Sequence, residues 1–334
     1  MPRLRRSDPS AKGFTRRKAG RGFTLLDDHG TRITDEETLR RIRALVIPPA
    51  WTDVWICPYP NGHIQAVGTD DAGRRQYLYH PHWREVRSEV KFERARGLGG
   101  CLPTLRRRLR QELDGSRLSQ ERVMACAVRL LDLGAFRVGS ESYAKQNSSF
   151  GLATLRRDHV HLVSEGVAFE FPAKSGQLGQ VVVTDPYVRE MVARLLRRRD
   201  DSPDLLAWWD QSRREWVDVK SAHINEHLRT LTRQDLTAKD FRTWHGSVLM
   251  AMNLAVHAAR GENLTKRRLA DAYREVSNEL GNTPAVVRSS YVDPRVVDLA
   301  ERGRTIPRFR IHRHELVPTK ASTSLHELLA AEQG

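Results

Sequence analysis

The sequence predicts an α+β protein, in which a small β-rich N-terminal domain precedes a larger, mainly α-helical domain that contains a small three-stranded sheet. Between residues 23 and 90, apolar residues fall in short β-rich segments that Gly, Asn, Asp and Pro interrupt. After about residue 90 they recur at helical spacing, with one β-rich interruption at 159–184. We therefore expect a flexible basic arm at 1–22, a β-rich domain at 23–90 and a mainly helical domain at 91–334.

Four segments of the N-terminal domain have the composition of strands: "FTLLDD", "DVWICPYP", "HIQAVGTD" and "RQYLYH". The segment "TDEETLRRIRALVIPPAW" separates the first strand from the others with a helix. Its double proline should end that helix, because proline lacks a backbone N–H and clashes with the preceding turn.

Helix signals dominate the second domain. Ser119 is the expected N-cap of "SQERVMACAVRLLDLGA", and Asp185 is that of "DPYVREMVARLLRRRD", with Pro186 at the first helical position. Ser324 and Glu327 of "SLHE" form a capping-box pattern. Further helices are expected at about 221–233, 238–258, 266–280, 284–303 and 324–332.

The β-rich interruption "HVHLVSEGVAFEFPAKSGQLGQVVVT" predicts three strands joined by two tight turns. The second of these turns carries Lys174. This island is the small sheet of the helical domain.

Charge is the strongest signal in the composition. The 334 residues include 56 Lys and Arg against 41 Asp and Glu, a net charge of +15. Basicity that recurs along the chain predicts a polyanionic partner, and nucleic acid before others. Apolar residues make up 39%, which is typical of a globular protein. No apolar run approaches the roughly 18 residues of a membrane span, and the N-terminus lacks the apolar core of a signal peptide, so we expect a cytoplasmic, nucleoid-associated protein and no membrane partner.

Several kinds of site are not indicated. Cys57, Cys101 and Cys126 lie far apart, without the spacing of a disulfide framework or a zinc site. There is no P-loop and no glycine-rich dinucleotide motif, so no nucleotide cofactor is expected. No carboxylate cluster of the kind that binds Mg²⁺ is visible, so we expect neither a metal nor another cofactor. Chemistry on phosphodiesters would then require cationic and neutral side chains, through a covalent nucleophile.

Four segments supply such groups. They carry Arg137 in "FRVGSESY", Lys174 in "FPAKSGQ", Arg242 in "KDFRTWHGSVL", and Tyr291 in "GNTPAVVRSSYVDP" with Asn282 nine residues before it. Each residue also has an ordinary structural interpretation. An arginine between aromatic residues often buries only its stem, a turn lysine is usually solvated, and a helix tyrosine usually packs. Asn282 lies just before a helix entry, with Thr283 as N-cap and Pro284 next.

Together and in this order, these segments resemble the type IB DNA topoisomerases, most closely the short poxvirus and bacterial branch. The matching motifs are "FRVGSESY…SSFGLATLRRDHV", "FPAKSG", "DFRTWHG" and "ELGNTPAVVRSSYVDPRV", preceded in the β-rich domain by "IPPAWTDVWI" and "GTDDAGRRQYLYH". The resemblance covers about residues 40 to 300. It implies relaxation of supercoiled double-stranded DNA by a monomer, without ATP or metal, in two lobes that close around the duplex with a hinge near residues 85–100.

The resemblance also implies a catalytic role for each residue. Tyr291 would attack a backbone phosphate and form a 3′-phosphotyrosyl link. Arg137 and Arg242 would contact its non-bridging oxygens, and Lys174 would donate a proton to the departing 5′ oxygen. Asn282 occupies a position where many members carry histidine. Asparagine can donate a hydrogen bond but cannot titrate near neutrality or bring a positive charge.

Further positions match DNA-contacting residues of the family. Arg74, Tyr77 and Tyr79 correspond to groove and phosphate contacts, a role that alternation along one strand face also permits. Tyr143 aligns with a tyrosine of the recognition segment, whereas Ser140 stands where poxvirus enzymes carry a lysine. The poxvirus cleavage sequence is therefore not expected to transfer.

Two alternatives remain at this point. A tyrosine recombinase would share the Arg-Lys-Arg-Tyr chemistry, but recombinases usually show a His-x-x-Arg box and here Lys239 lies three residues before Arg242. A catalytically weak DNA-binding clamp is favoured only by Asn282.

Overall fold

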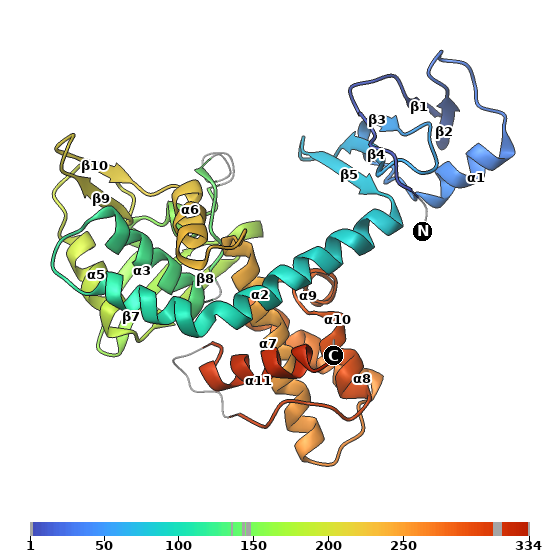
Figure 1. Cartoon of the computed structure of the whole chain (residues 1–334). Helices are drawn as coiled ribbons and strands as arrows, with labels where there is room; N and C mark the ends of the chain where they lie inside the picture. The colour runs from blue at the N-terminus through green and yellow to red at the C-terminus, as the bar shows by residue number, and fades with distance from the viewer. Residues whose placement is uncertain (1–2, 135, 142–143, 145–147, 310–315, 333–334) are drawn as a thin grey trace. The chain divides into compact units, whose positions relative to one another are not determined.

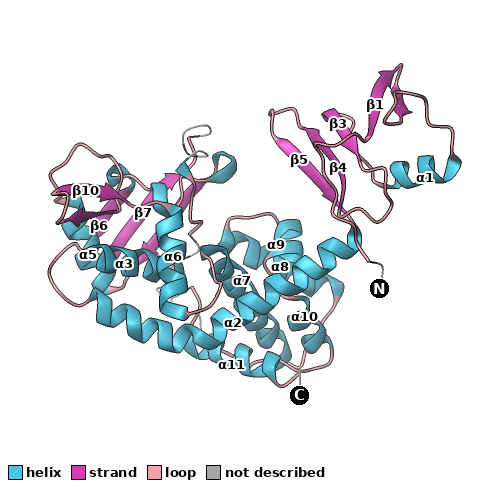
Figure 2. Cartoon of the chain, turned by 45° about the horizontal axis from the view of Figure 1, so that its top comes forward, coloured by secondary structure: helices cyan, strands magenta, loops and turns pink. Residues whose placement is uncertain are grey.

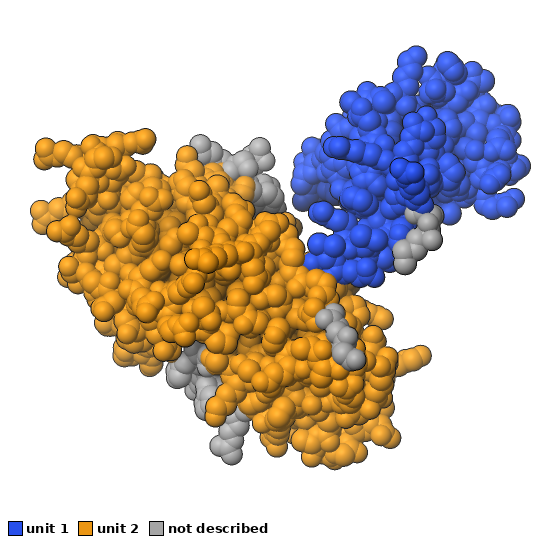
Figure 3. All heavy atoms as spheres, in the orientation of Figure 1, with its two compact units in different colours: residues 1–90 blue, residues 91–334 orange. Residues whose placement is uncertain are grey.

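The computed structural model describes residues 3–134, 136–141, 144, 148–309 and 316–332 (Figure 1). The chain divides into two compact units, residues 1–90 and 91–334 (Figure 3). The division falls inside one long helix, α2, which runs over Pro81–Leu113 and so includes the segment that we expected to act as a hinge.

The N-terminal unit is built on an antiparallel sheet with the strand order β2-β1-β3-β4-β5. Its elements before α2 are β1 (Phe14–Ala19), β2 (Gly22–Leu26), α1 (Glu36–Ala44), β3 (Thr52–Ile56), β4 (Ile64–Thr69) and β5 (Arg75–Tyr79). A small core joins the helix to the sheet, because Ile42 of α1 packs with Val54, Ile56 and Ala66 of β3 and β4. The expected strands and the expected helix are all present.

The expectation of a flexible arm over residues 1–22 is wrong for much of that segment. Strand β1 lies between β2 and β3 in the sheet, and it pairs with both. Before it, the N–H of Arg5 donates to the carbonyl of Asn61, and the Arg5 guanidinium lies 3.6 Å from the centre of the Tyr59 ring. Arginine combines an apolar stem with a planar cation that stacks on aromatic rings, so a basic segment can still pack.

The C-terminal unit is mainly helical and contains a three-stranded and a two-stranded antiparallel sheet (Figures 1 and 2). The α+β fold class is thereby confirmed. Within the described residues, its α-helices after α2 are α3 (Gln120–Leu133), α5 (Pro186–Leu196), α6 (Ser221–Thr232), α7 (Ala238–Ala259), α8 (Lys266–Leu280), α9 (Pro284–Ser290), α10 (Pro294–Glu301) and α11 (Thr319–Ala330). Its strands are β6 (Val160–Val163), β7 (Gly166–Pro172), β8 (Leu178–Val183), β9 (Ala207–Asp210) and β10 (Glu215–Asp218).

Helix α7 lies at the centre of this unit and contacts α3, α6, α8, α10 and α11. Most of its residues are buried, including Phe241 and Trp244 on either side of Arg242. Helix α2 passes close to it, since a Cβ added to Gly99 would lie 2.3 Å from the Trp244 ring. The predicted N-caps Ser119, Asp185 and Thr283 are confirmed by side-chain hydrogen bonds to backbone N–H groups.

Two details of the helical unit differ from expectation. The hairpin β9–β10 adds a second β-rich segment, whose four-residue strands are too short to give a clear alternation. Helix α11 begins at Thr319 after Pro318, so Ser324 and Glu327 lie inside the helix and do not cap it. The apolar positions Ala321, Leu325 and Leu329 extend the buried face toward the N-terminal end, which explains the earlier start.

The expected helix 284–303 is interrupted, and the interruption contains Tyr291. Helix α9 ends at Ser290 and α10 begins at Pro294. A proline disfavours helical backbone at the residue before it, and Asp293 instead adopts an extended conformation and caps α10. Tyr291 therefore lies at a helix end, in a bend between two short helices.

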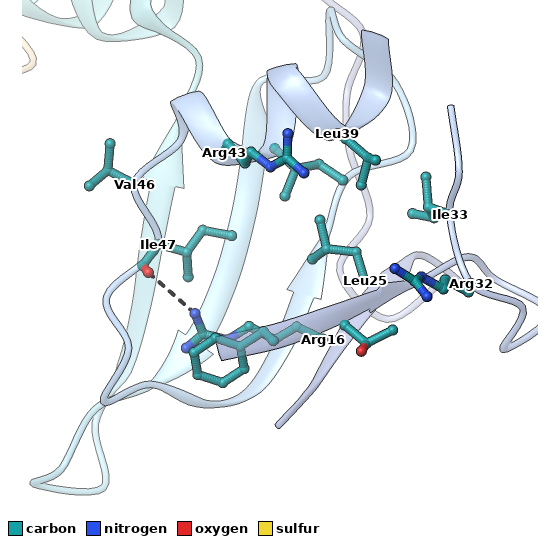
Figure 4. Close-up of a pocket in the computed structure, with 11 residues that line it drawn as sticks. Arg16, Leu25, Arg32, Ile33, Leu39, Arg43, Val46 and Ile47 are labelled. Carbon is teal, nitrogen blue, oxygen red and sulfur yellow. Dashed lines mark hydrogen bonds between the residues drawn. The ribbon is translucent and has the colours of Figure 1, made fainter. Parts of the chain in front are cut away.

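None of the helices in the described residues is both long enough and apolar enough to cross a bilayer. The N-terminal unit contains a cleft of about 370 Å³ between α1 and β2 (Figure 4). Arg16, Arg32 and Arg43 line it together with apolar side chains of both elements. None of the residues to which the sequence assigned chemistry lines this cleft.

Candidate active site

Tyr291 is held by helix α7 through close backbone contacts. A Cβ added to Gly246 of α7 would lie 2.5 Å from the Tyr291 carbonyl oxygen and 3.0 Å from its Cβ, so only glycine fits at this position. The next residue, Ser247, donates from its hydroxyl to the carbonyl of Thr243 and, at 3.4 Å, to that of Tyr291. Ser247 Oγ also accepts from the N–H of Asp293 at 3.0 Å. Gly246 and Ser247 thus fix both ends of the bend that carries the tyrosine.

Arg242 lies one helical turn before Gly246, beside the tyrosine ring. Its guanidinium carbon is 5.2 Å from the centre of the Tyr291 ring. Its Nη2 donates to the carbonyl of Leu280 and to Asn282 Oδ1, both at 2.6 Å. The side chain is almost fully enclosed, since Arg242 is only 3% exposed. A charged group is therefore held in a fixed orientation next to the phenol.

Arg137 reaches the same place from the loop after α3. Its Nη2 donates to the carbonyl of Gly281 at 2.6 Å. The backbone at Arg137 pairs with the segment around Gly151, whose Leu152 N–H donates to the Arg137 carbonyl at 2.8 Å. A Cβ on Gly151 would lie 2.5 Å from the nitrogen of Gly139, so two glycines allow this close pairing. A negative charge on the Tyr291 phenol would raise the pKa of Arg137, so Tyr291 lies within electrostatic range of this guanidinium.

Asn282 follows Gly281, whose left-handed backbone (φ +56°) ends helix α8. The Asn282 N–H donates to the carbonyl of Ser277 at 3.0 Å, which fixes the residue after the helix end. Because arginine carries only donors, the side-chain oxygen of Asn282 must face Arg242, and its amide nitrogen remains as a donor. Asn282 thus orients the buried arginine.

Lys174 lies in the 3-10 turn Lys174–Gly176, which joins β7 to β8, and its side chain is exposed. Its neighbours Ala173 and Gln177 line a cleft of about 140 Å³. Arg137 and Gly281 contribute to the lining of the same cleft. The lysine turn therefore borders the guanidinium site, while the lysine itself extends from the protein surface.

Burial determines the electrostatics of the two arginines. Burial first and the nearby charge of Arg137 second lower the pKa of Arg242, Tyr291 opposes the shift, and the net pKa is about 10. Burial also lowers the pKa of Arg137. A pKa of about 10 still leaves Arg242 charged at pH 7. His245, three residues after Arg242, is fully buried, and burial lowers its pKa to about 4, so it carries no charge at pH 7.

The candidate DNA contacts of the N-terminal unit do not share one face of its sheet. Tyr77 and Tyr79 share one face of β5, with ring centres 6.1 Å apart in a stacked arrangement. Arg74 does not alternate with them, because it precedes the strand and its Nε donates to Asp70 Oδ2 at 2.9 Å. The arginine on the tyrosine face is Arg75, which sequence reasoning missed although a count of two residues back from Tyr77 gives it. Tyr143 lies outside the described residues.

Three further residues of the site were missed from the sequence. Gly281 and Leu280 supply carbonyl oxygens to the arginines, and Gly246 admits the tyrosine backbone. The glycine in "TWHGS" was a visible signal, since a glycine inside an apolar helix usually has a packing or functional reason. Among the described residues, no three His, Cys, Asp or Glu side chains gather into a group that could hold a metal ion.

Comparison with known proteins gives two family matches. Residues 80–306, more than half of the chain, match the model of the eukaryotic DNA topoisomerase I catalytic core, and residues 22–70 match that of the bacterial DNA topoisomerase IB N-terminal domain. The chain is 27% identical to DNA topoisomerase 1B of Acanthamoeba polyphaga mimivirus over 298 residues, which cover 87% of this chain and 88% of the relative.

Two further relatives are similar over less of their own length. DNA topoisomerase 1 of Schizosaccharomyces pombe is 29% identical over 256 residues, 73% of this chain but only 29% of the yeast protein. DNA topoisomerase 1B of Vaccinia virus is 21% identical over 241 residues, 70% of this chain and 72% of the viral protein. With both family models matched in order along one chain, the protein belongs to the type IB DNA topoisomerases, enzymes of the isomerase class that act on DNA.

Proposed function

We propose that this protein relaxes supercoiled duplex DNA by cutting one strand transiently with Tyr291, in the absence of ATP and metal ions. The observation that carries this proposal is the meeting of Arg137, Arg242 and Asn282 around Tyr291, from segments that lie far apart in the sequence. One chain supplies every group, so a monomer is sufficient. DNA as substrate makes the protein nucleoid-associated.

The cleavage step exchanges one phosphodiester for another. Tyr291 Oη attacks the phosphorus, the bond from phosphorus to the 5′ oxygen breaks, and the phenol proton is released. The products are a 3′-phosphotyrosyl link and a strand that ends in a 5′ hydroxyl. Religation reverses the step after the free strand has rotated. Because the energy of the bond is retained in the phosphotyrosine, resealing needs no nucleotide.

The two arginines would stabilise the charge that builds up in the transition state. Forming a phenolate from a free phenol at pH 7 costs about 4 kcal/mol. Guanidiniums beside the phenol favour that anion, and they also stabilise the equatorial phosphoryl oxygens as the bond forms. Arg242 suits this role because its carbonyl and amide contacts fix its orientation before DNA binds. Asn282 would assist by orienting Arg242 and by donating from its amide nitrogen to a phosphoryl oxygen.

Lys174 would act as the general acid. A 5′ alkoxide is a poor leaving group, so protonation of that oxygen typically accelerates the reaction about 10²–10⁴-fold. The exposed position of Lys174 at the tip of the β7–β8 hairpin supports this role, because the tip can enter a groove of the bound duplex. On the N-terminal sheet, Arg75, Tyr77 and Tyr79 present a cationic and aromatic face that suits phosphate and sugar contacts. Arg74, which is bonded to Asp70, would have to leave that partner to reach DNA.

The test is relaxation of plasmid DNA of either supercoil sign in EDTA without ATP, over a range of salt. Tyr291→Phe should abolish relaxation and the covalent DNA adduct while it leaves DNA affinity within about two-fold, because only the attacking hydroxyl is removed. Mass analysis of the adduct identifies the blocked DNA end. Persistent supercoils with the unmodified protein at all salt concentrations would refute the enzyme assignment, and an active Tyr291→Phe variant would require another nucleophile.

A further inference from the structure

The first residues of α2 in the C-terminal unit contact the chain on both sides of Tyr291. Lys91 Nζ donates to the carbonyl of Ser289, two residues before the tyrosine, at 3.3 Å. Glu93 Oε1 accepts from Nη1 of Arg295, four residues after it, at 2.6 Å. Figures 1 and 2 both show α9 and α10 beside this part of α2. The helix that joins the two units is therefore bonded to both ends of the tyrosine bend.

The contact through Glu93 continues to helix α7. Arg295 donates from Nε to Asp293 Oδ1 at 3.0 Å and from Nη2 to Oδ2 at 2.6 Å. Asp293 is only 3% exposed, and its N–H donates to Ser247 Oγ at 3.0 Å. A chain of hydrogen bonds thus runs from α2 through the two residues Asp293 and Arg295 to α7, the helix that carries Arg242. A charged partner such as Arg295 strengthens each of its bonds to a carboxylate.

Lys91 is not an ordinary surface lysine. Its Nζ lies 4.0 Å from the centre of the Phe92 ring, and burial lowers the Lys91 pKa to about 8 against the opposing charge of Asp293. Arg94, three residues further along α2, donates from Nη2 to Asp240 Oδ2 at 2.9 Å, two residues before Arg242. Within the four residues Lys91 to Arg94, α2 therefore binds the segments that carry Tyr291 and the buried Arg242.

We propose that Lys91 and Glu93 are positioning residues for the cleavage step, which hold the Tyr291 bend against α7 from the side of the connecting helix. This inference rests on the proposed function of Tyr291 as nucleophile. Neither residue belongs to the group around the phenol, so both act through others: Lys91 through the Ser289 carbonyl, and Glu93 through Arg295 and Asp293. Small displacements of a reacting atom are costly, since an error of about 1 Å can reduce a rate about 10²-fold.

The experiment compares Lys91→Met and Glu93→Gln with the unmodified chain in single-turnover cleavage of a short duplex at saturating DNA. We expect each variant to form the covalent adduct about 10-fold to 100-fold more slowly. In a Tyr291→Phe background, where binding is measured without cleavage, DNA affinity should change by less than about two-fold. Lys91→Arg should restore most of the rate, because a longer cation can still donate to the Ser289 carbonyl.

Matched controls separate positioning from general effects of charge and stability. Lys320→Met and Glu89→Gln make the same chemical changes at exposed positions of α11 and α2, and their cleavage rates should equal that of the unmodified chain. Losses of rate that follow losses of DNA affinity or of Tm would overturn the proposal, and so would wild-type cleavage by Lys91→Met and Glu93→Gln. Failure of the proposed function is distinguishable, because then the unmodified chain forms no adduct or Tyr291→Phe still forms one.

Discussion

The two arginines beside Tyr291 and the lysine of the β7–β8 turn are held in opposite ways. Arg242 is 3% exposed and bonded to the Leu280 carbonyl and to Asn282, and Arg137 is bonded to the Gly281 carbonyl. Lys174 is exposed in the turn of a hairpin. The guanidiniums of the two arginines are thus oriented by hydrogen bonds within the chain, whereas the lysine side chain is exposed at the protein surface.

This difference matches the part of the DNA that each group would contact under the proposed function. In the proposed mechanism, charge on the phosphoryl oxygens develops next to the tyrosine, so donors fixed at that point lose little energy to reorganisation during the reaction. In the same proposal, the 5′ oxygen belongs to the DNA strand that departs, so the proton donor has to reach that strand. The comparison predicts that the role of the arginines depends on geometry, whereas the role of the lysine depends on the chemistry of the leaving group.

The largest effect after loss of the nucleophile is expected at Arg242. Arg242→Ala should slow single-turnover cleavage about 10³-fold, and Arg242→Lys about 10²-fold, because an ammonium cannot reproduce the planar fork that binds Leu280, Asn282 and the phosphate together. Removal of the guanidinium also leaves the buried Leu280 carbonyl without this donor, so Tm should fall. Quenched-flow measurement of adduct formation, together with Tm, checks both expectations.

The matched control is Arg122→Lys. Arg122 is a buried arginine of the same unit, but it donates to Leu113, Arg117 and Glu190. The Arg122→Lys variant should have a lower Tm but an unchanged cleavage rate. If Arg242→Lys cleaved at the wild-type rate, the fixed geometry of the guanidinium would not matter. The contrast drawn between the arginines and Lys174 would then be wrong.

The second prediction concerns Lys174 and the leaving group. Lys174→Ala should slow cleavage of ordinary DNA about 10²–10³-fold, as expected for loss of a general acid. With sulfur in place of the bridging 5′ oxygen, the loss should shrink to a few-fold, because a thiol has a pKa near 8.5 and leaves without protonation. Lys220→Ala, a change at another exposed lysine, serves as control and should cleave both substrates normally. An equal loss on both substrates would contradict a proton-donor role.

The sequence predicted well the features that depend on local chemistry. The fold class, the caps at Ser119, Asp185 and Thr283, and the hairpin around Lys174 follow from neighbouring residues alone. The interruption of the helix at Tyr291 also has a local signal, because Asp293 and Pro294 are typical of a new helix start. The apolar periodicity from Val292 to Val297 nevertheless favoured one long helix. When two local signals conflict, periodicity alone decides wrongly.

The rest depends on contacts between distant segments. No pattern in the sequence shows that Arg242 will donate to the Leu280 carbonyl, or that Gly246 will touch Tyr291. The same limit applies to Lys91 and Ser289, which lie 198 residues apart. Family resemblance assigned the candidate catalytic side chains, but the residues that hold them in place emerged only from the packing.

A smaller effect is expected at Asn282, and it tests how the arginine site tolerates a change of charge. Asn282→Ala removes the amide contact to Arg242 and should slow cleavage about 10-fold, since the Leu280 carbonyl still orients the guanidinium. Asn282→Asp keeps an oxygen toward Arg242 but adds a negative charge where the phosphate binds, so it should be slower than Asn282→Ala despite its nearly identical shape. Adduct formation at pH 7 gives the order of the two rates. If Asn282→Asp formed the adduct faster than Asn282→Ala, Asn282 would act only by holding Arg242.

The smallest effect is expected in the N-terminal unit, where Tyr77 is 42% exposed and stacks on Tyr79. Tyr77→Ala should weaken DNA binding about five-fold, the loss of about 1 kcal/mol from one contact, and should leave cleavage at saturating DNA unchanged. Phe23→Ala provides the control, because Phe23 is a similarly exposed aromatic residue of the same sheet that lines the cleft beside α1 (Figure 4). It should bind DNA as the unmodified chain does. A fall in the cleavage rate of Tyr77→Ala at saturating DNA would mean that the N-terminal sheet contributes to the placement of the reacting groups, and that the separation of binding from chemistry between the units is incomplete.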